Sequence, residues 1–197
     1  MVLITIVGSS LPLTISKITA KNNATNNTNE TKFSVTTSMI LTTTVAILIS
    51  IFTILLKPLF VNLIGDSLGY ELILYLLPSV VFTAVYAQIR GYLWGIENYF
   101  AVSIVEFVEQ ILRIALCLIF VNINVFHSSL ISVGLALSIA CGLSTFLGIY
   151  LYYRNKGRFA YKKGYFKPII QSTLPLTGVR IFNSLLQPII SIIIPIS

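Results

Sequence analysis

Long hydrophobic runs alternate with short polar connections along the whole chain. A helix needs about 20 mostly apolar residues to cross roughly 30 Å of hydrocarbon. Six segments have this character, at about residues 1–19, 38–56, 71–92, 100–121, 129–153 and 168–197. Helices are expected here because an unclosed sheet would leave backbone N–H and C=O groups unpaired in lipid. The pattern predicts an all-α, polytopic transmembrane helical bundle of about six helices, with residues 1–197 forming a single transmembrane domain.

Composition supports a membrane protein, since 56% of the residues are hydrophobic, 10% are charged and the mean hydropathy is +0.91. The hydrophobic runs recur to the last residue, which a secretory signal peptide would not explain. No enzyme is predicted, because His127 is the only histidine and no serine or cysteine has a base at motif spacing. Cys117 and Cys141 are expected to be small buried hydrophobic residues. The sequence predicts no catalytic residue, no metal site and no cofactor.

The connections differ in charge, and the difference predicts an orientation. The connections at 20–37 and 154–167 hold eight of the thirteen lysines and arginines, and Arg90 lies just before the connection at 92–99, which contains Glu97. The positive-inside rule places these three connections in the cytoplasm of a bacterial cell, so the first helix enters from outside. Three glycosylation sequons in the Asn-rich first connection are interpreted as chance matches on that side. Neither end of the chain has a polar anchor, so we expect a fragment of a longer protein.

The most basic segment, RNKGRFAYKKGYFK, interleaves six cations with aromatic residues. Nucleic-acid binding is one interpretation of such a run. A juxtamembrane segment is favoured, with aromatic rings at the depth of the lipid headgroups and cations near anionic lipid. The lipid bilayer is therefore the expected partner, and nucleic acid is not.

One predicted helix carries charges in its middle. At 100° per residue, its polar side chains share a face about 120° wide, and they include Glu106, Glu109, Gln110 and Arg113. A charge at the bilayer centre costs about 2.5 to 3.5 kcal/mol on an insertion scale. We therefore expect this polar face to meet protein or water rather than lipid.

The last predicted helix has a similar polar face, which includes Arg180, Asn183 and Gln187. Pro175 and Pro188 interrupt that helix and are expected to bend it, as Pro12 is in the first helix. Bent helices with freed carbonyl groups are common where transporters line a cavity. The two polar faces are therefore expected to line one space.

Two interpretations of the charged face stay open. In the first, the charges hold helices together: Glu109 pairs with Arg113 one turn away, Glu106 bonds Gln110, and Arg90 and Arg180 are further partners. In the second, the same residues contact a transported head group or a coupling ion such as H⁺ or Na⁺.

The stretch IRGYLWGIENYFAVSIVEFVEQILRIAL resembles the signature of the stage V sporulation protein B group. LPLTISKITA and STLPLTGVRIFNSLLQPII resemble two further blocks of that group, in the same order. The group is similar to lipid II flippases and to polysaccharide exporters of the multidrug, oligosaccharidyl-lipid and polysaccharide (MOP) exporter superfamily, which includes MATE-type transporters.

The resemblance implies about fourteen helices in two lobes around a central cavity. The present chain would match the second to seventh helices, most of the N-terminal lobe. It also implies a flippase or exporter that moves a lipid-linked sugar pyrophosphate for the cell wall, the spore cortex or another polysaccharide. Lys17, Arg90 and Arg180 are the implied candidates for pyrophosphate contact. The alternatives are a cation-coupled multidrug exporter of the same fold and a truncated membrane protein without transport activity.

Overall fold

A computed structural model of the chain describes residues 2–25, 27–58, 61, 67–123, 129–162, 166, 169, 171 and 173. Its elements are α1 (Val2–Ala24), α2 (Thr28–Leu55), α4 (Ser67–Gly95), α5 (Tyr99–Asn122) and α6 (Ser129–Arg154). The described part of the chain contains no strand, so the predicted all-α fold is confirmed. The predicted helix at 168–197 lies almost wholly outside the described residues.

The second helix begins earlier than the hydropathy pattern predicts. That pattern predicts a connection over 20–37, whereas α1 continues to Ala24 and α2 begins at Thr28. The first half of α2 is rich in buried hydroxyl side chains, namely Thr31, Ser34, Thr37 and Ser38. Serine and threonine lower the mean hydropathy of a segment, so a hydropathy pattern disfavours a membrane-spanning helix there. In a packed helix, however, a hydroxyl can donate to a carbonyl of the preceding turn, as Ser38 does to Val35 at 3.0 Å.

Within the described part of the chain, three helices are long and apolar enough to cross a membrane: Thr28–Leu55, Leu68–Gly95 and Ser129–Arg154. Large apolar side chains on α2 and α5 are exposed on the surface of the bundle, among them Phe52, Leu55, Phe107 and Leu118. Such surfaces suit contact with lipid. The chain is a multi-pass membrane protein.

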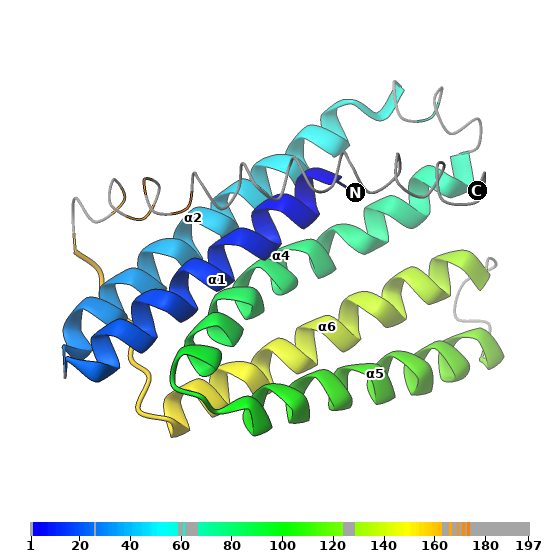
Figure 1. Cartoon of the computed structure of the whole chain (residues 1–197). Helices are drawn as coiled ribbons and strands as arrows, with labels where there is room; N and C mark the ends of the chain where they lie inside the picture. The colour runs from blue at the N-terminus through cyan, green and yellow to red at the C-terminus, as the bar shows by residue number, and fades with distance from the viewer. Residues whose placement is uncertain are drawn as a thin grey trace, which may run out of the picture.

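Helix α4 lies in the middle of the bundle (Figure 1), with α1 and α2 on one side and α5 and α6 on the other. Among the described helices it is the one that contacts all the others. The α1–α2 connection, the α4–α5 connection and the end of α6 lie at the same end of the bundle (Figure 1). We call this the basic end. The three connections that were predicted to be cytoplasmic therefore share one side, as the sequence predicted, and the assignment of that side to the cytoplasm stays a prediction.

Helices α1 and α4 touch through their backbones. A Cβ atom added to Gly91 would lie 2.4 Å from the carbonyl oxygen of Pro12, and one added to Gly95 would lie 2.7 Å from that of Ser16. Small residues four apart permit this close approach in membrane proteins. Pro12 is fully buried inside α1, at the contact with Gly91. The two glycines therefore set how closely α1 and α4 pack.

A hydrophobic core near the basic end takes residues from all five described helices, including Ile15, Val35, Leu93, Val105 and Tyr152. The Tyr152 ring stacks on Phe159, beyond the end of α6, with 4.7 Å between ring centroids. This core fixes the ends of the helices relative to one another.

Candidate charged site between three helices

Asn98 sets the start of α5. Its side-chain oxygen accepts a hydrogen bond from the backbone N–H of Ala101 at 3.1 Å, which caps the helix. Its side-chain nitrogen donates to the side-chain oxygen of Asn155, beyond α6, at 2.8 Å. The rotation of α5 then buries Val102 and Val105 and exposes Phe107 on another face. The polar stripe runs between the buried face and the exposed apolar face.

The first ion pair joins two turns of α5 and reaches α6. Arg113 donates from Nη2 to Oε1 of Glu109, the pair that the spacing predicted. The same Nη2 lies 3.4 Å from Sγ of Cys141 on α6, and that thiol lies 3.6 Å from Glu109 Oε1. The Glu109 side chain is only 15% exposed and that of Arg113 is 35% exposed. The three groups therefore form a closed polar triangle at the α5–α6 contact.

The second ion pair joins α5 to α4. Arg90 Nη1 donates to Oε1 of Glu106 at 3.3 Å, and the two side chains are 30% and 47% exposed. The guanidinium of Arg90 also lies 4.9 Å from the centre of the Trp94 ring, a cation–π contact. Glu106 thus pairs with a neighbouring helix, in place of the expected bond to Gln110, which is exposed.

The two pairs are close to the same buried tyrosine. Tyr86 is 6% exposed, and its hydroxyl is near enough to Glu106, Arg90 and Glu109 to interact electrostatically with each of them. That hydroxyl and the Nε atoms of both arginines are buried without a hydrogen-bond partner among the described residues. A guanidinium has five N–H donors. Both arginines therefore keep a donor that no described residue accepts.

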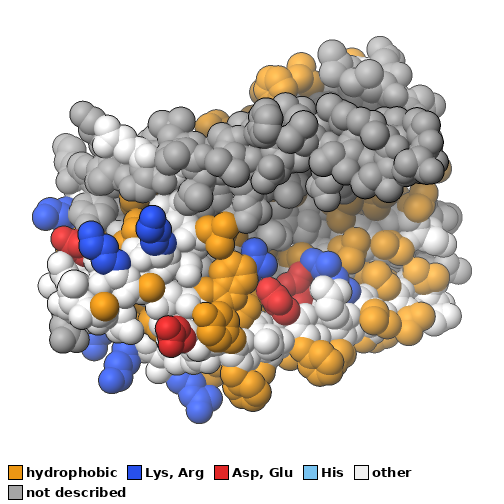
Figure 2. All heavy atoms as spheres, viewed as in Figure 1, with side chains coloured by type: hydrophobic (Ala, Val, Ile, Leu, Met, Phe, Trp, Pro, Cys, Tyr) orange, Lys and Arg blue, Asp and Glu red, His pale blue; other side chains and the backbone are white. Residues whose placement is uncertain are grey.

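Figure 2 shows acidic and basic side chains side by side in the middle of one face, with hydrophobic side chains around them. Lys17 is exposed on α1 and belongs to neither ion pair. Arg180, Asn183, Gln187, Pro175 and Pro188 lie outside the described residues. We call the part-exposed row formed by Arg90, Glu106, Glu109 and Arg113 the charged stripe. That the five residues outside the described part share one space with this stripe stays a prediction.

The family model for polysaccharide biosynthesis proteins matches residues 1–196. The chain belongs to this family. The narrower resemblance to the stage V sporulation protein B group is an expectation that this match leaves open.

This member of the polysaccharide biosynthesis family is also similar to a solved structure, described as the inward-facing conformation of a multidrug resistance MATE family transporter of the MOP superfamily. The TM-score is 0.76 and the sequence identity is 16%, over 90% of this chain and 43% of the transporter. The likeness shows the fold. The chain spans less than half the length of that transporter. No curated protein matches the chain by sequence.

The contact of Cys141 with the charged site of this family member was not predicted from the sequence. Both cysteines were expected to be apolar packing residues, whereas Cys141 lies within hydrogen-bond distance of Arg113 and Glu109. The correction follows from the rotation of α6, which turns a face of small residues toward α4 and α5. A weak signal was present, since Cys141 lies three residues after Ser138 and four before Thr145, both of which donate to carbonyls of α4. Within the described residues no group of His, Cys, Asp and Glu is suited to hold a metal ion.

Proposed function

We propose that this chain forms one lobe of a bacterial cell-membrane exporter that moves a lipid-linked sugar pyrophosphate across the bilayer, with its basic end in the cytoplasm. The observation that carries the proposal is the charged stripe, in which the side chains of Arg90 and Arg113 are 30% and 35% exposed along α4 and α5, and each keeps a buried Nε donor without a partner among the described residues. Pyrophosphate is a polyanion, and a guanidinium binds phosphate oxygens through its fork of N–H groups. Membership of a polysaccharide biosynthesis family supports this class of substrate.

The ion pairs suggest how such a site works. In the empty site, Glu106 and Glu109 neutralise Arg90 and Arg113, so that no unpaired charge faces the membrane interior. An entering pyrophosphate competes for the same guanidinium groups and releases the carboxylates. A freed carboxylate then takes up H⁺ or Na⁺, which would couple the movement of lipid to that of an ion. When the head group leaves, the original pairs form again.

Other residues of the proposed site extend this scheme. Lys17 and Arg180 add positive charge for the head group, and Asn183 and Gln187 add neutral hydrogen-bonding groups beside it. Bent helices at Pro12, Pro175 and Pro188 let the lobe rock while the lipid tail stays in the bilayer.

A second candidate function is a cation-coupled multidrug exporter. It is favoured by the likeness in fold to a multidrug resistance transporter and by the two carboxylates of the stripe. In this function a cationic drug would bind Glu106 and Glu109 directly. Loss of an arginine should therefore weaken the transport of a lipid-linked pyrophosphate, whereas it should not weaken the binding of a cationic drug to the two carboxylates.

The test is reconstitution in proteoliposomes with a fluorescent lipid-linked sugar pyrophosphate, where translocation is measured by quenching from one side. We expect Arg113→Gln to reduce translocation at least tenfold, since a lost charge-assisted contact is worth about 1.5 to 3 kcal/mol. Arg154→Gln is the matched control, because Arg154 is an exposed cation at the end of α6 and belongs to neither ion pair. We expect it to leave translocation unchanged.

The proposal would be contradicted if the same vesicles take up a cationic dye, and if this uptake is lost on substitution of Glu109 but kept on substitution of Arg113. That result would favour the drug exporter. Vesicles that move neither the lipid nor the dye would favour a membrane protein without transport activity.

A further inference from the structure

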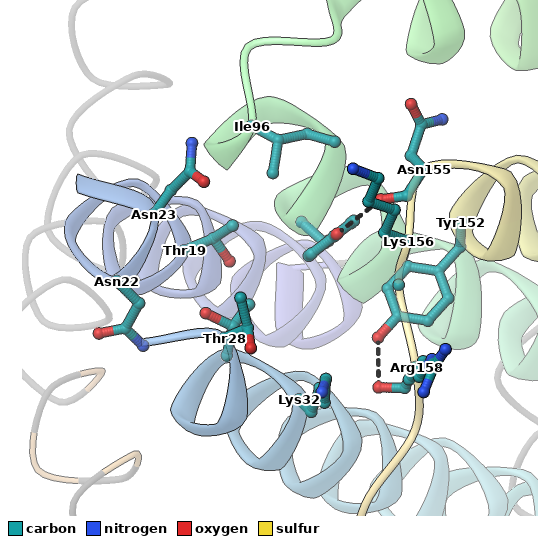
Figure 3. Close-up of a pocket in the computed structure, with 13 residues that line it drawn as sticks. Thr19, Asn22, Asn23, Thr28, Lys32, Ile96, Tyr152, Asn155, Lys156 and Arg158 are labelled. Atoms are coloured by element: carbon teal, nitrogen blue, oxygen red, sulfur yellow. Dashed lines mark hydrogen bonds between the residues drawn. The ribbon is translucent and has the colours of Figure 1, made fainter. Parts of the chain in front are cut away.

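A second polar region lies at the basic end, away from the charged stripe. It is a hollow of about 240 Å³ enclosed by α1, the start of α2, the end of α4 and the segment after α6. Figure 3 shows its side chains around one space, among them Thr19, Asn22, Thr28, Lys32, Lys156 and Arg158. A single water needs about 10 to 15 Å³, so the volume of the hollow is far larger than one water requires. The hollow is therefore large enough for a polyatomic ligand.

The charge of the hollow selects an anion. Lys32, Lys156 and Arg158 line it, and none of the described residues that line it is acidic. The N-terminus of α2 also faces it through Thr28 and Lys32, and the Asn27 side chain makes no capping hydrogen bond there. The first backbone N–H groups of a helix lack partners within the helix, and the positive end of the helix dipole favours an anion.

Two buried polar atoms independently indicate a ligand. Thr19 is 2% exposed and Asn22 is 5% exposed, and both line the hollow. The Thr19 hydroxyl and the Asn22 side-chain nitrogen have no hydrogen-bond partner among the described residues. A buried polar group without a partner destabilises a protein. Both atoms are donors at the wall of the hollow, and a rotation of either side chain would bring its donor to an oxygen-rich ligand there.

The position of Lys156 adds a further indication. Gly157 N–H donates to the carbonyl of Tyr152 at 2.9 Å and Lys156 N–H to that of Tyr153 at 3.1 Å, which together close α6 in a Schellman motif. Lys156 has φ of 63° there, a left-handed conformation that favours glycine. The end of α4 has the same motif with Glu97 at φ of 61°. Because Glu97 does not line the hollow, the left-handed conformation alone indicates no ligand, and what distinguishes Lys156 is that this motif holds its cationic side chain at the lining of the hollow.

We infer that this hollow binds a phosphate group. Three cations, an uncapped helix N-terminus and two buried donors match the charge and the several acceptor oxygens of phosphate. The group can belong to a dissolved phosphate or to the headgroup of an anionic phospholipid, since the basic end of the bundle is where headgroups would lie. The inference does not depend on the proposed transport function, because the hollow shares no lining residue with the two ion pairs.

The first test compares two glycine substitutions in the full chain. Lys156→Gly removes a lining cation and relieves the left-handed backbone, whereas Glu97→Gly relieves the same strain outside the hollow. Binding of inorganic phosphate is measured from the rise of the thermal unfolding midpoint in detergent, at constant ionic strength. We expect Lys156→Gly to weaken phosphate binding about tenfold while the protein stays at least as stable without phosphate. Glu97→Gly should gain similar stability and keep its affinity for phosphate.

The second test removes a single hydroxyl. Thr19→Val keeps the shape of the side chain and deletes an atom that has no partner among the described residues, so the fold should be at least as stable. We expect phosphate binding to weaken severalfold. Lys21→Gln removes a nearby cation that does not line the hollow, and affinity should change less than twofold.

The source of the phosphate is decided with lipid. Native mass spectrometry of the chain from vesicles with and without phosphatidylglycerol shows whether this lipid stays bound. If it does and Lys156→Gly releases it, the ligand is a headgroup; if only inorganic phosphate binds, the ligand is a dissolved anion. The inference is overturned if neither binds, or if Lys21→Gln weakens binding as much as Lys156→Gly, since the cations would then act only as a diffuse positive surface.

Discussion

The two sides of α4 are packed in different ways. Toward α1, Gly91 and Gly95 bring backbone against backbone, and the nearest atoms to an added Cβ on Gly91 belong to the main chain of Pro12. Toward α5, the long side chains of Arg90 and Glu106 span the gap and stay partly exposed. The first contact is held by shape, and the second by charge.

This difference separates rigidity from adaptability. A backbone carbonyl in a helix cannot move aside without breaking the helix, so the α1–α4 contact has one arrangement. An arginine has several rotatable bonds and five donors, so it can exchange one acceptor for another without a change of the fold. A site that must bind and release a charged ligand is better placed on the α5 side.

The largest effect should come from the rigid side. We expect Gly91→Ala to destabilise the protein by about 2 kcal/mol, because overpacking usually costs about 1 to 3 kcal/mol and exceeds the roughly 1 kcal/mol that alanine gains in a helix. The measurement is the unfolding free energy in detergent. Gly142→Ala is the control, since its added Cβ would lie 3.2 Å from the Phe82 ring, a side chain that can shift. Equal losses for the two variants would contradict the comparison.

The next effect should come from the less exposed ion pair. Arg113→Gln leaves the Glu109 carboxylate, 15% exposed, without its partner, and should destabilise the protein by about 1 to 2 kcal/mol. Adding Glu109→Gln should recover part of this loss. The double-mutant cycle should give a coupling energy of about 0.5 to 1 kcal/mol, more than the roughly 0.2 to 0.5 kcal/mol of an exposed pair one turn apart, because this pair is partly buried. Additive losses would mean that the two side chains do not interact.

The features of the fold and of the charged site that depend on residues close together in the sequence could be predicted, and others could not. The five described helices were predictable because a membrane-spanning helix requires a long apolar run. The shared basic end was predictable because lysines and arginines gather on one side of a membrane protein. The Glu109–Arg113 pair was predictable since both residues lie on one helix, one turn apart. The start of α2 was missed because its packed face is made of hydroxyl side chains, which a hydropathy pattern cannot tell from a polar connection.

Contacts between helices were less predictable, for a physical reason. Arg90 was a candidate partner for the acidic residues, but its pairing with Glu106 depends on how α4 and α5 are rotated about their axes. That rotation is set by Asn98 and Asn155, which are far apart in the sequence. The role of Cys141 depends likewise on how closely α5 approaches α6. A periodic pattern gives the face of a residue on its own helix, and says little about which helix that face meets.

A smaller effect is expected for the more exposed pair, and its dependence on salt shows what the stripe faces. Arg90 and Glu106 are 30% and 47% exposed in the bundle, so a double-mutant cycle of Arg90→Gln and Glu106→Gln should give less than about 1 kcal/mol. If the stripe faces a water-filled cavity, raising the salt concentration should reduce this coupling, because ions screen exposed charges. The control is the Glu109–Arg113 cycle, which should change less with salt. A coupling that is independent of salt would place Arg90 and Glu106 away from water.

The smallest effect should be found at Cys141, and it tests whether the thiol acts as a polar group. Serine keeps a donor and an acceptor at the same place, so Cys141→Ser should change the unfolding free energy by less than about 0.5 kcal/mol. Cys141→Val fills the space without either and should destabilise by about 0.5 to 1 kcal/mol, the usual net value of one hydrogen bond. This order is the reverse of what a purely apolar cysteine would give, since valine would then be the better replacement. If valine is tolerated and serine is not, Glu109 and Arg113 hold each other without help from α6, and the charged site is a property of α4 and α5 alone.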